Sequence, residues 1–148
     1  GPYALGCMTM YMGTEIAQVE SRTRKLDTGV DVEDELKILY KDGRKASLHL
    51  RMDTPHEEHR QEVEIIGTNG KLWMNEVANP TKVQLMTLEQ LHFRGMPPVS
   101  GYEHEWIAFE RALAAGKREC EEVPHSVTQA ISQVMDSVFS QAEIVFPF

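Results

Sequence analysis

Residues 36–52 read LKILYKDGRKASLHLRM, and this stretch decides the fold class. On both sides of its centre, apolar residues alternate with polar or charged ones, which is the period-two pattern of a half-buried β-strand. Asp42-Gly43 between the two runs favours a tight hairpin turn. The stretch therefore predicts two antiparallel strands, and the residues of the first that face the core are Leu36, Ile38 and Tyr40.

The same alternation continues outward from this hairpin. An earlier strand is expected from Ile16 to Lys25. Gly67-Thr68-Asn69-Gly70 is the strongest hairpin signal in the chain, because Asn-Gly tolerates the positive φ that such turns need. Period-two runs lie on both sides of it, at Val63, Ile65, Leu72, Met74, Val83 and Leu85. Residues 14–87 are therefore predicted to form about six antiparallel strands.

The two ends of the chain have helical periodicity. Residues 2–12 are apolar and unbroken, and Gly13 is expected to end that helix. Residues 101–115 place one apolar face at Tyr102, Trp106, Phe109 and Leu113, with Gly116 as the stop. A last helix is expected after Ser126, an N-cap whose capping box Gln129 completes.

These elements predict an α+β fold, in which an open-faced, mainly antiparallel sheet of about six strands is covered by helices on one face. Residues 1–148 are expected to form a single domain. If Leu36, Ile38 and Tyr40 face the helices, the period of two places a second set of apolar side chains on the open face. That set is Leu39, Ile66, Trp73 and Met86, and we expect it to form the interface of a homodimer or higher oligomer.

Composition excludes several classes of protein. The chain has 148 residues, 41% hydrophobic and 26% charged, which is typical of a soluble globular protein. Its net charge is −8 and it has no basic stripe, so a nucleic-acid partner is not expected. No apolar run is long enough to cross a membrane. The two cysteines form no disulfide framework, which favours a reducing, cytoplasmic location.

Motifs that carry chemistry are few. His56-Glu57-Glu58-His59 has its histidines three apart instead of the four that a helical zinc motif needs, so a solvated loop is expected and no metal site. His104-Glu105 at the start of a helix suits either a surface position or an acid–base role in a pocket. There is no glycine-rich dinucleotide turn, P-loop, nucleophile elbow or Cys-x-x-Cys motif.

The order of signals along residues 1–148 nevertheless resembles one family. Gly1-Pro2-Tyr3 resembles the second half of an Asp-x-Gly-x-Tyr motif, and Gly67-Thr68-Asn69-Gly70 resembles a Gly-Thr-x-Gly hairpin. Further correspondences lie at Thr28-Gly29-Val30-Asp31, Gly101-Tyr102-Glu103-His104-Glu105, Gly116 to Ser126, Met135-Asp136 and Phe146-Pro147. Together they resemble the C-terminal domain of the glucose–fructose oxidoreductase, inositol dehydrogenase and MocA-type (Gfo/Idh/MocA) oxidoreductases, nearest the dihydrodiol and xylose dehydrogenase branch.

The resemblance implies a function for the parent protein. Members are NAD(P)-dependent dehydrogenases with a Rossmann domain before this one, and their second domain closes the pocket for a sugar, polyol or cyclic diol. It assigns Tyr3 a catalytic role at the hydroxyl that loses its proton. A phenol needs a nearby cation or a proton relay for this, and the family supplies a Lys from its first domain.

The chain as given is expected to be inactive alone. It has no phosphate-binding turn, so NAD or NADP is expected in the parent enzyme and no cofactor on this chain. It is either a substrate-binding and oligomerisation domain of an oxidoreductase or a stand-alone, non-enzymatic module of the same fold. A glycine-rich βα turn encoded upstream of Gly1 would favour the first, and an adjacent start codon the second.

Overall fold

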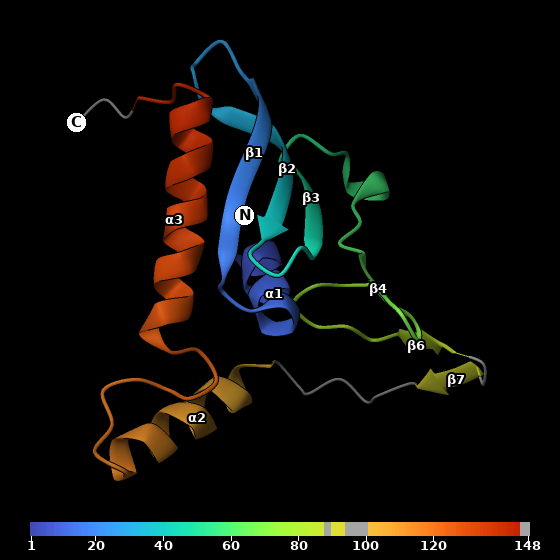
Figure 1. The fold of residues 1–148 in the computed structure, drawn as a ribbon, viewed down its shortest axis with the longest axis vertical. Helices are drawn as coiled ribbons and strands as arrows, with labels where there is room; N and C mark the ends of the chain where they lie inside the picture. Colours follow the sequence, from blue (N-terminus) through green and yellow to red (C-terminus); the bar gives the residue numbers. More distant parts are fainter. Residues whose placement is uncertain (88–89, 94–100, 146–148) are drawn as a thin grey trace. The chain divides into compact units, whose positions relative to one another are not determined.

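The computed structural model describes residues 1–87, 90–93 and 101–145 (Figure 1). It consists of two compact units, Gly1–His56 with Val123–Phe148, and Glu57–Glu122. The helices are α1 (Pro2–Met12), the short 3-10 helix η1 (His56–Glu58), α2 (Tyr102–Ala114) and α3 (His125–Gln141). The strands are β1 (Ile16–Lys25), β2 (Asp31–Tyr40), β3 (Lys45–Arg51), β4 (Val63–Gly67), β5 (Gly70–Met74), β6 (Val83–Met86) and β7 (Gln90–Phe93).

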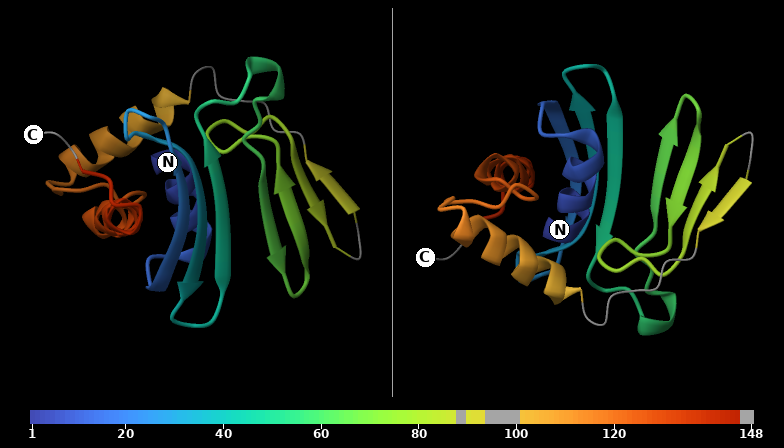
Figure 2. Two further views of the ribbon diagram at one scale, coloured as in Figure 1. Left: turned by 90° about the horizontal axis from the view of Figure 1, so that it is seen from above. Right: turned by 90° about the horizontal axis from the view of Figure 1, so that it is seen from below.

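The core of the first unit lies between one face of the β1–β3 sheet and two helices. The buried cluster joins α1, β2 and α3 through Leu5, Met8, Leu36, Ile38, Tyr40, Val134 and Val138. Seen from above and below, α1 and α3 lie on the same side of this sheet (Figure 2). The sequence prediction that Leu36, Ile38 and Tyr40 face helices is therefore confirmed.

Local sequence sets the ends of these elements. Pro2 stands in the first turn of α1, where its missing N–H breaks no helical hydrogen bond. Gly13 ends the helix with a φ of 77°, and its N–H donates to the Thr9 carbonyl at 2.8 Å. Gly43 takes a φ of 88° in the β2–β3 turn. Both glycines occupy backbone conformations that a side chain would strain.

Helix α3 also fixes the outer strand of this sheet. The Gln141 side chain accepts hydrogen bonds from the Ser21 N–H at 2.8 Å and the Ser21 hydroxyl at 3.1 Å, and donates to the Val19 carbonyl at 2.9 Å. Lys25 donates to the Ala142 carbonyl at 2.7 Å. The Gln141 bonds to the Ser21 N–H and the Val19 carbonyl occupy backbone groups at the edge of β1 that would otherwise be free to pair with another chain.

The second unit contains a four-stranded antiparallel meander in the order β4-β5-β6-β7. Its first hairpin closes at the pair Gly67 and Gly70, as Asn69-Gly70 predicts. At Gly70 a Cβ would clash with the Met86 carbonyl oxygen on the neighbouring strand. A side chain there would push β5 away from β6, so close strand pairing requires this glycine.

The structure corrects three expectations. The strands form two sheets, of three and four strands, so the single sheet of about six strands is not confirmed. Alternation predicts where strands lie but not which strands hydrogen-bond to one another. In both sheets, each strand pairs only with strands next to it in sequence. The seventh strand, β7, was not predicted. Pro124 is the N-cap of α3 and the helix begins at His125, so Ser126 lies inside the first turn and forms no capping box.

The α+β class and all three long helices are confirmed. Helix α2 differs from the others because none of its side chains is buried. The face predicted by periodicity is exposed at Tyr102, Trp106, Phe109 and Leu113. The correspondence at Phe146-Pro147 lies outside the described residues.

Candidate functional site

Tyr3 lies on the outer side of α1. The inner side of this helix buries Leu5, Met8 and Thr9 against the first unit, and Tyr3 is 76% exposed. Helical spacing places Cys7 and Met10, four and seven residues further on, on the same outer side. The phenol that the resemblance selects is therefore accessible to a ligand, and its hydroxyl has no hydrogen-bond partner within the described residues.

Cys7 is the other reactive group on this side of α1. Its thiol is half-buried and free, and burial raises the pKa of the thiol. A raised pKa keeps the sulfur protonated near neutral pH, and a thiol is a poor nucleophile compared with a thiolate. The outer side of α1 thus presents the phenol of Tyr3 beside a thiol that is chemically quiet.

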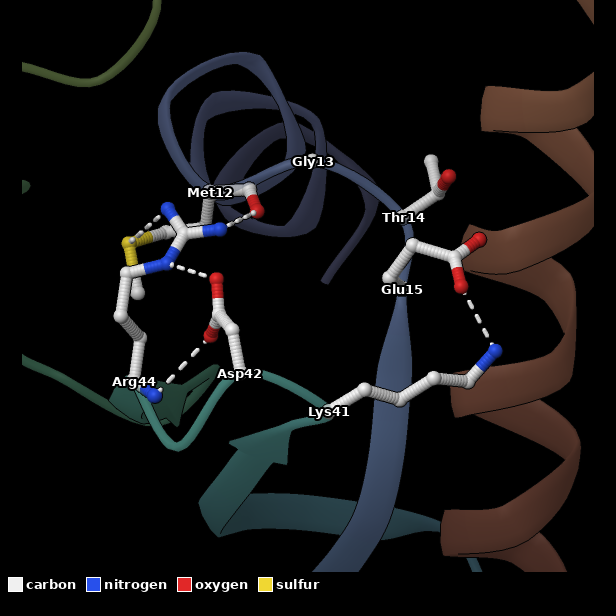
Figure 3. A pocket seen from close by; sticks show the side chains of 7 residues that line it. All are labelled: Met12, Gly13, Thr14, Glu15, Lys41, Asp42 and Arg44. Atoms are coloured by element: carbon white, nitrogen blue, oxygen red, sulfur yellow. Dashed lines mark hydrogen bonds and ion pairs between the residues drawn. The ribbon is translucent and has the colours of Figure 1, made fainter.

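A hollow of about 440 Å³ lies where α1 passes into β1, opposite the β2–β3 turn (Figure 3). The cationic side chains that line it, Lys41 and Arg44, already bond to neighbouring groups. Lys41 donates to a Glu15 carboxylate oxygen at 2.6 Å, and Arg44 donates to an Asp42 oxygen at 2.6 Å and to the Met12 carbonyl at 3.0 Å. Each positive charge in the hollow is bonded to an acceptor, so the hollow offers no free site for an anion. The Arg44 bond to the Met12 carbonyl links the β2–β3 turn to the end of α1.

Tyr40 lies under the same turn. The Arg44 guanidinium carbon is 5.5 Å from the centre of the Tyr40 ring, within the range of a cation–π contact. The Tyr40 hydroxyl is buried without a partner among the described residues, and burial raises its pKa above the ordinary value of 10.0. This phenol therefore stays neutral near pH 7.

The face of the β1–β3 sheet opposite the helices carries charged side chains in register. Arg24 on β1 and Arg51 on β3 both pair with Glu33 on β2. Arg24 Nε lies 2.8 Å from a Glu33 oxygen, and its Nη2 lies 2.7 Å from Asp53. Arg51 bonds to Asp53 at 3.1 Å, and His49 Nε2 lies 2.7 Å from Glu33. We call these five residues the charged cluster.

The charged cluster shifts the pKa of its acids. The His49 and Arg24 hydrogen bonds, in that order, hold the pKa of Glu33 below its ordinary value of 4.5. Arg24 and then Arg51 do the same for Asp53, whose ordinary value is 3.8. Both acids thus remain charged at neutral pH, and the positive side chains around them are paired. The cluster is a solvated, internally neutralised surface.

The predicted interface residues divide between the two sheets. In the β4–β7 sheet, the register places Ile66, Lys71 and Met86 in one row, with Glu64, Trp73 and Gln84 in the next. Ile66, Trp73 and Met86 therefore share one face, as predicted, and Ile66 is 76% exposed. Leu39 belongs to the other sheet, on the face that carries the charged cluster. The structure thus brings three of the four together.

The remaining sequence candidates lie on the surface. All four residues of His56-Glu57-Glu58-His59 are exposed, in and after η1, and His104 is exposed in the first turn of α2. The described residues contain no group of three metal-binding side chains. None of the described helices is long and apolar enough to cross a membrane.

Comparison with known sequences points to one family for slightly less than half of the chain. Residues 1–73 match the family model of the GFO/IDH/MocA C-terminal domain. The match covers α1, the β1–β3 sheet and most of the β4–β5 hairpin, so it includes Tyr3. The resemblance is thereby confirmed for these residues. No curated protein matches the chain in sequence.

Solved structures share the fold of almost the whole chain. The 3-ketoreductase KijD10 from Actinomadura kijaniata, in complex with NADP and TDP-benzene, is 22% identical with a TM-score of 0.74 over 94% of this chain. UDP-N-acetylglucosamine 3-dehydrogenase GnnA from Acidithiobacillus ferrooxidans is 15% identical, with a TM-score of 0.76 over 95% of this chain. An oxidoreductase from Agrobacterium radiobacter, in complex with NAD⁺, L-tartaric acid and magnesium, is 12% identical, with a TM-score of 0.74 over 97% of this chain. This chain spans 43%, 46% and 45% of these proteins.

Sequence reasoning missed the charged cluster. Its members come from three strands and the loop after β3, and only the register brings them into contact. The signal was present in the opposite charges on consecutive strands, because Arg24, Glu33 and Arg51 become directly opposed once the hairpins are aligned. The buried hydroxyl of Tyr40 leaves no such signal, since a buried Tyr and a buried Phe occupy the same positions in a strand pattern.

Proposed function

We propose that this chain is the C-terminal, substrate-binding domain of an NAD(P)-dependent oxidoreductase of the GFO/IDH/MocA family. The observation that carries the proposal is the position of Tyr3. It lies within the residues that match the family model, and α1 presents its phenol to solvent instead of packing it in the core. The oxidoreductases that share the fold support the same class of reaction.

The reaction is the reversible oxidation of a secondary alcohol. The substrate carbon loses a hydride to the nicotinamide ring, its hydroxyl loses a proton, and a carbonyl, NAD(P)H and one proton are formed. Tyr3 takes or relays the hydroxyl proton. With an ordinary pKa near 10, a phenol does this at neutral pH when a cation lies beside it. The resemblance places that cation on a lysine of the preceding domain.

The substrate that we propose is a sugar, with a polyol or cyclic diol as less favoured choices. Support comes from the relatives in fold, two of which are named for reactions at position 3 of their substrates, one of these a UDP-N-acetylglucosamine. Placement near the dihydrodiol and xylose dehydrogenases stays a prediction. The cofactor is NAD or NADP, because relatives in fold hold both.

We also propose that residues 1–148 act as one substrate-binding and oligomerising domain, in a homodimer or higher oligomer. Contact is made through the open sheet faces that carry Leu39, Ile66, Trp73 and Met86. The shared face of Ile66, Trp73 and Met86 supports this, because apolar side chains grouped among polar ones are typical of protein interfaces. The free Cys7 and Cys120 support a reducing, cytoplasmic location.

The proposal is tested by nucleotide and sugar together. The full-length protein that carries this chain should bind NADH or NADPH saturably and oxidise a sugar with the matching oxidised nucleotide. Residues 1–148 alone should bind neither nucleotide in calorimetry, because they contain no phosphate-binding turn. Saturable nucleotide binding by residues 1–148 would contradict the assignment of nucleotide binding to the preceding domain. A full-length protein without oxidoreductase activity on any sugar or polyol would contradict the whole proposal.

A further inference from the structure

Two rows of charged side chains cross the open face of the β1–β3 sheet, next to the charged cluster. The register of β1 and β2 places Arg22 opposite Glu35. In the neighbouring row it places Glu20 opposite Lys37. All four side chains are exposed, and alternation puts them on the face opposite the buried Leu36. We call these four residues the quartet.

The quartet differs from the charged cluster in its pairing. Every acid of the cluster bonds to a base, so the cluster needs no partner. In contrast, Arg22, Glu35 and Lys37 form no ion pair with a described residue. Glu20 accepts a hydrogen bond from the neutral Gln18 amide at 3.0 Å and has no cationic partner among the described residues. The quartet therefore presents two positive and two negative charges to another molecule.

The order of these charges is complementary to itself. Along β1 the negative Glu20 stands two residues from the positive Arg22, and along β2 the negative Glu35 stands two residues from the positive Lys37. A second copy can face this sheet across a two-fold axis that runs across the strands, between the two rows. That rotation exchanges the rows, so Arg22 faces Glu20 of the second copy and Lys37 faces Glu35 of the second copy. Symmetry repeats each contact, which gives four attractive pairs.

The other face-to-face arrangement is repulsive. A two-fold axis that runs along β2 leaves each row in place and lays β2 over its own copy. Glu35 then faces Glu35 and Lys37 faces Lys37. Like charges that oppose each other across an interface disfavour that arrangement, which is how charged residues exclude wrong partners and wrong orientations. The quartet thus distinguishes between the two ways of stacking identical sheets.

We propose that the quartet recognises a second copy of this chain and fixes an antiparallel stacking of the two β1–β3 sheets. The inference rests on the proposed function, which places a homodimer contact on the open sheet faces, and it adds the orientation and the residues that determine it. Stacked sheets lie about 10 Å apart, a gap that two long charged side chains can span together. The four pairs lie next to the axis, where the usual crossing angle of about 30° between packed sheets displaces them least.

The test reverses the charges at two positions of the full-length protein. Lys37→Glu brings two glutamates together at each contact, and Glu35→Lys brings two lysines together. Each change should raise the Kd of the dimer roughly tenfold or more in sedimentation velocity. The double variant Glu35→Lys/Lys37→Glu restores opposite signs and should associate nearly as the wild type does. Asp136→Lys is the control, because it reverses a charge at an exposed position of α3, on the covered side of the sheet.

A mixture of the two single variants separates contacts between copies from contacts within one chain. Lys37 also stands opposite Glu20 of its own chain, so Lys37→Glu can lower Tm without any dimer contact. Mixing cannot repair a defect within one chain, whereas the glutamates of the Lys37→Glu variant face the lysines of the Glu35→Lys variant in an antiparallel dimer. An equal mixture should therefore form heterodimers with nearly the wild-type Kd.

Three results would overturn the inference. These are single variants that dimerise as the wild type does, a mixture that stays monomeric, and an Asp136→Lys protein that is weakened as much as the single variants. In each case a wild type that still dimerises keeps the proposed contact between sheet faces and loses only the orientation. A wild type that is monomeric at every concentration removes the proposed contact itself, and the inference fails with it.

Discussion

One face of each sheet in this chain carries a distinct kind of side chain. The β1–β3 sheet buries one face under α1 and α3, and its other face carries the charged cluster, in which each acid is paired with a base. The β4–β7 sheet instead places Ile66, Trp73 and Met86 together on one face. The first arrangement is complete in water, whereas the second is more favourable when another surface covers it. The period-two pattern of the sequence did not distinguish these two faces from each other.

The largest expected effect concerns the covered face of the first sheet. Leu36 is 2% exposed within the cluster shared with the helices, and Leu85 in the second sheet is 36% exposed. Leu36→Ala should therefore lower the free energy of unfolding by about 2–5 kcal/mol, because it removes buried contacts and leaves a cavity. Leu85→Ala should cost about 1 kcal/mol. Urea unfolding followed by circular dichroism measures both, and equal losses would contradict the burial assigned to Leu36.

An effect of intermediate size is expected on self-association, and it should differ between the two faces proposed for the interface. Trp73→Glu introduces a charge among the apolar residues of the second sheet and should weaken an oligomer by about 2 kcal/mol or more, as at interface hot spots. Leu39→Glu makes the same change beside the charged cluster and should weaken it less. Sedimentation velocity over a range of concentrations gives both values. A wild-type chain that stays monomeric, or a Trp73→Glu chain that associates unchanged, removes the proposed interface.

The smallest expected effect is the acid sensitivity of the charged cluster. The folded-state pKa of Glu33 is lowered, so its pairing stabilises the fold at neutral pH. That contribution is lost as the pH falls below the ordinary value of 4.5 and through the folded-state pKa. Glu33→Gln should therefore make stability less dependent on pH in this acidic range. Glu35→Gln is the control, since Glu35 forms no ion pair with a described residue. Urea midpoints at several pH values measure the difference, and identical pH profiles for wild type and Glu33→Gln would contradict it.

The sequence predicted most local features of this fold because each has a short-range cause. Gly13 ends α1, Asp42-Gly43 turns the chain, and the period of two places Leu36 inside and Trp73 on the opposite face of its own sheet. What sequence reasoning could not give depends on pairing between distant segments. The division into two sheets and the contact of Arg24 with Asp53 require the register. The start of α3 at His125 depended on Pro124, whose extended backbone caps a helix without a side-chain acceptor.

The candidate site was predictable in part for the same reason. Tyr3 was selected by resemblance, and its exposure follows from the helical spacing that buries Leu5 and Met8 on the other side.

The central claim, that the exposed phenol of Tyr3 moves the substrate proton, is tested most directly by the kcat of Tyr3→Phe in the full-length enzyme. Tyr11→Phe is the matched control, because it removes the same hydroxyl from the same helix, where Tyr11 is 45% exposed. Tyr3→Phe should lower kcat by about 10²–10⁴-fold with the dinucleotide Kd unchanged, and Tyr11→Phe should leave kcat near the wild-type value. A Tyr3→Phe enzyme with nearly full kcat, or equal losses in the two variants, would contradict the claim.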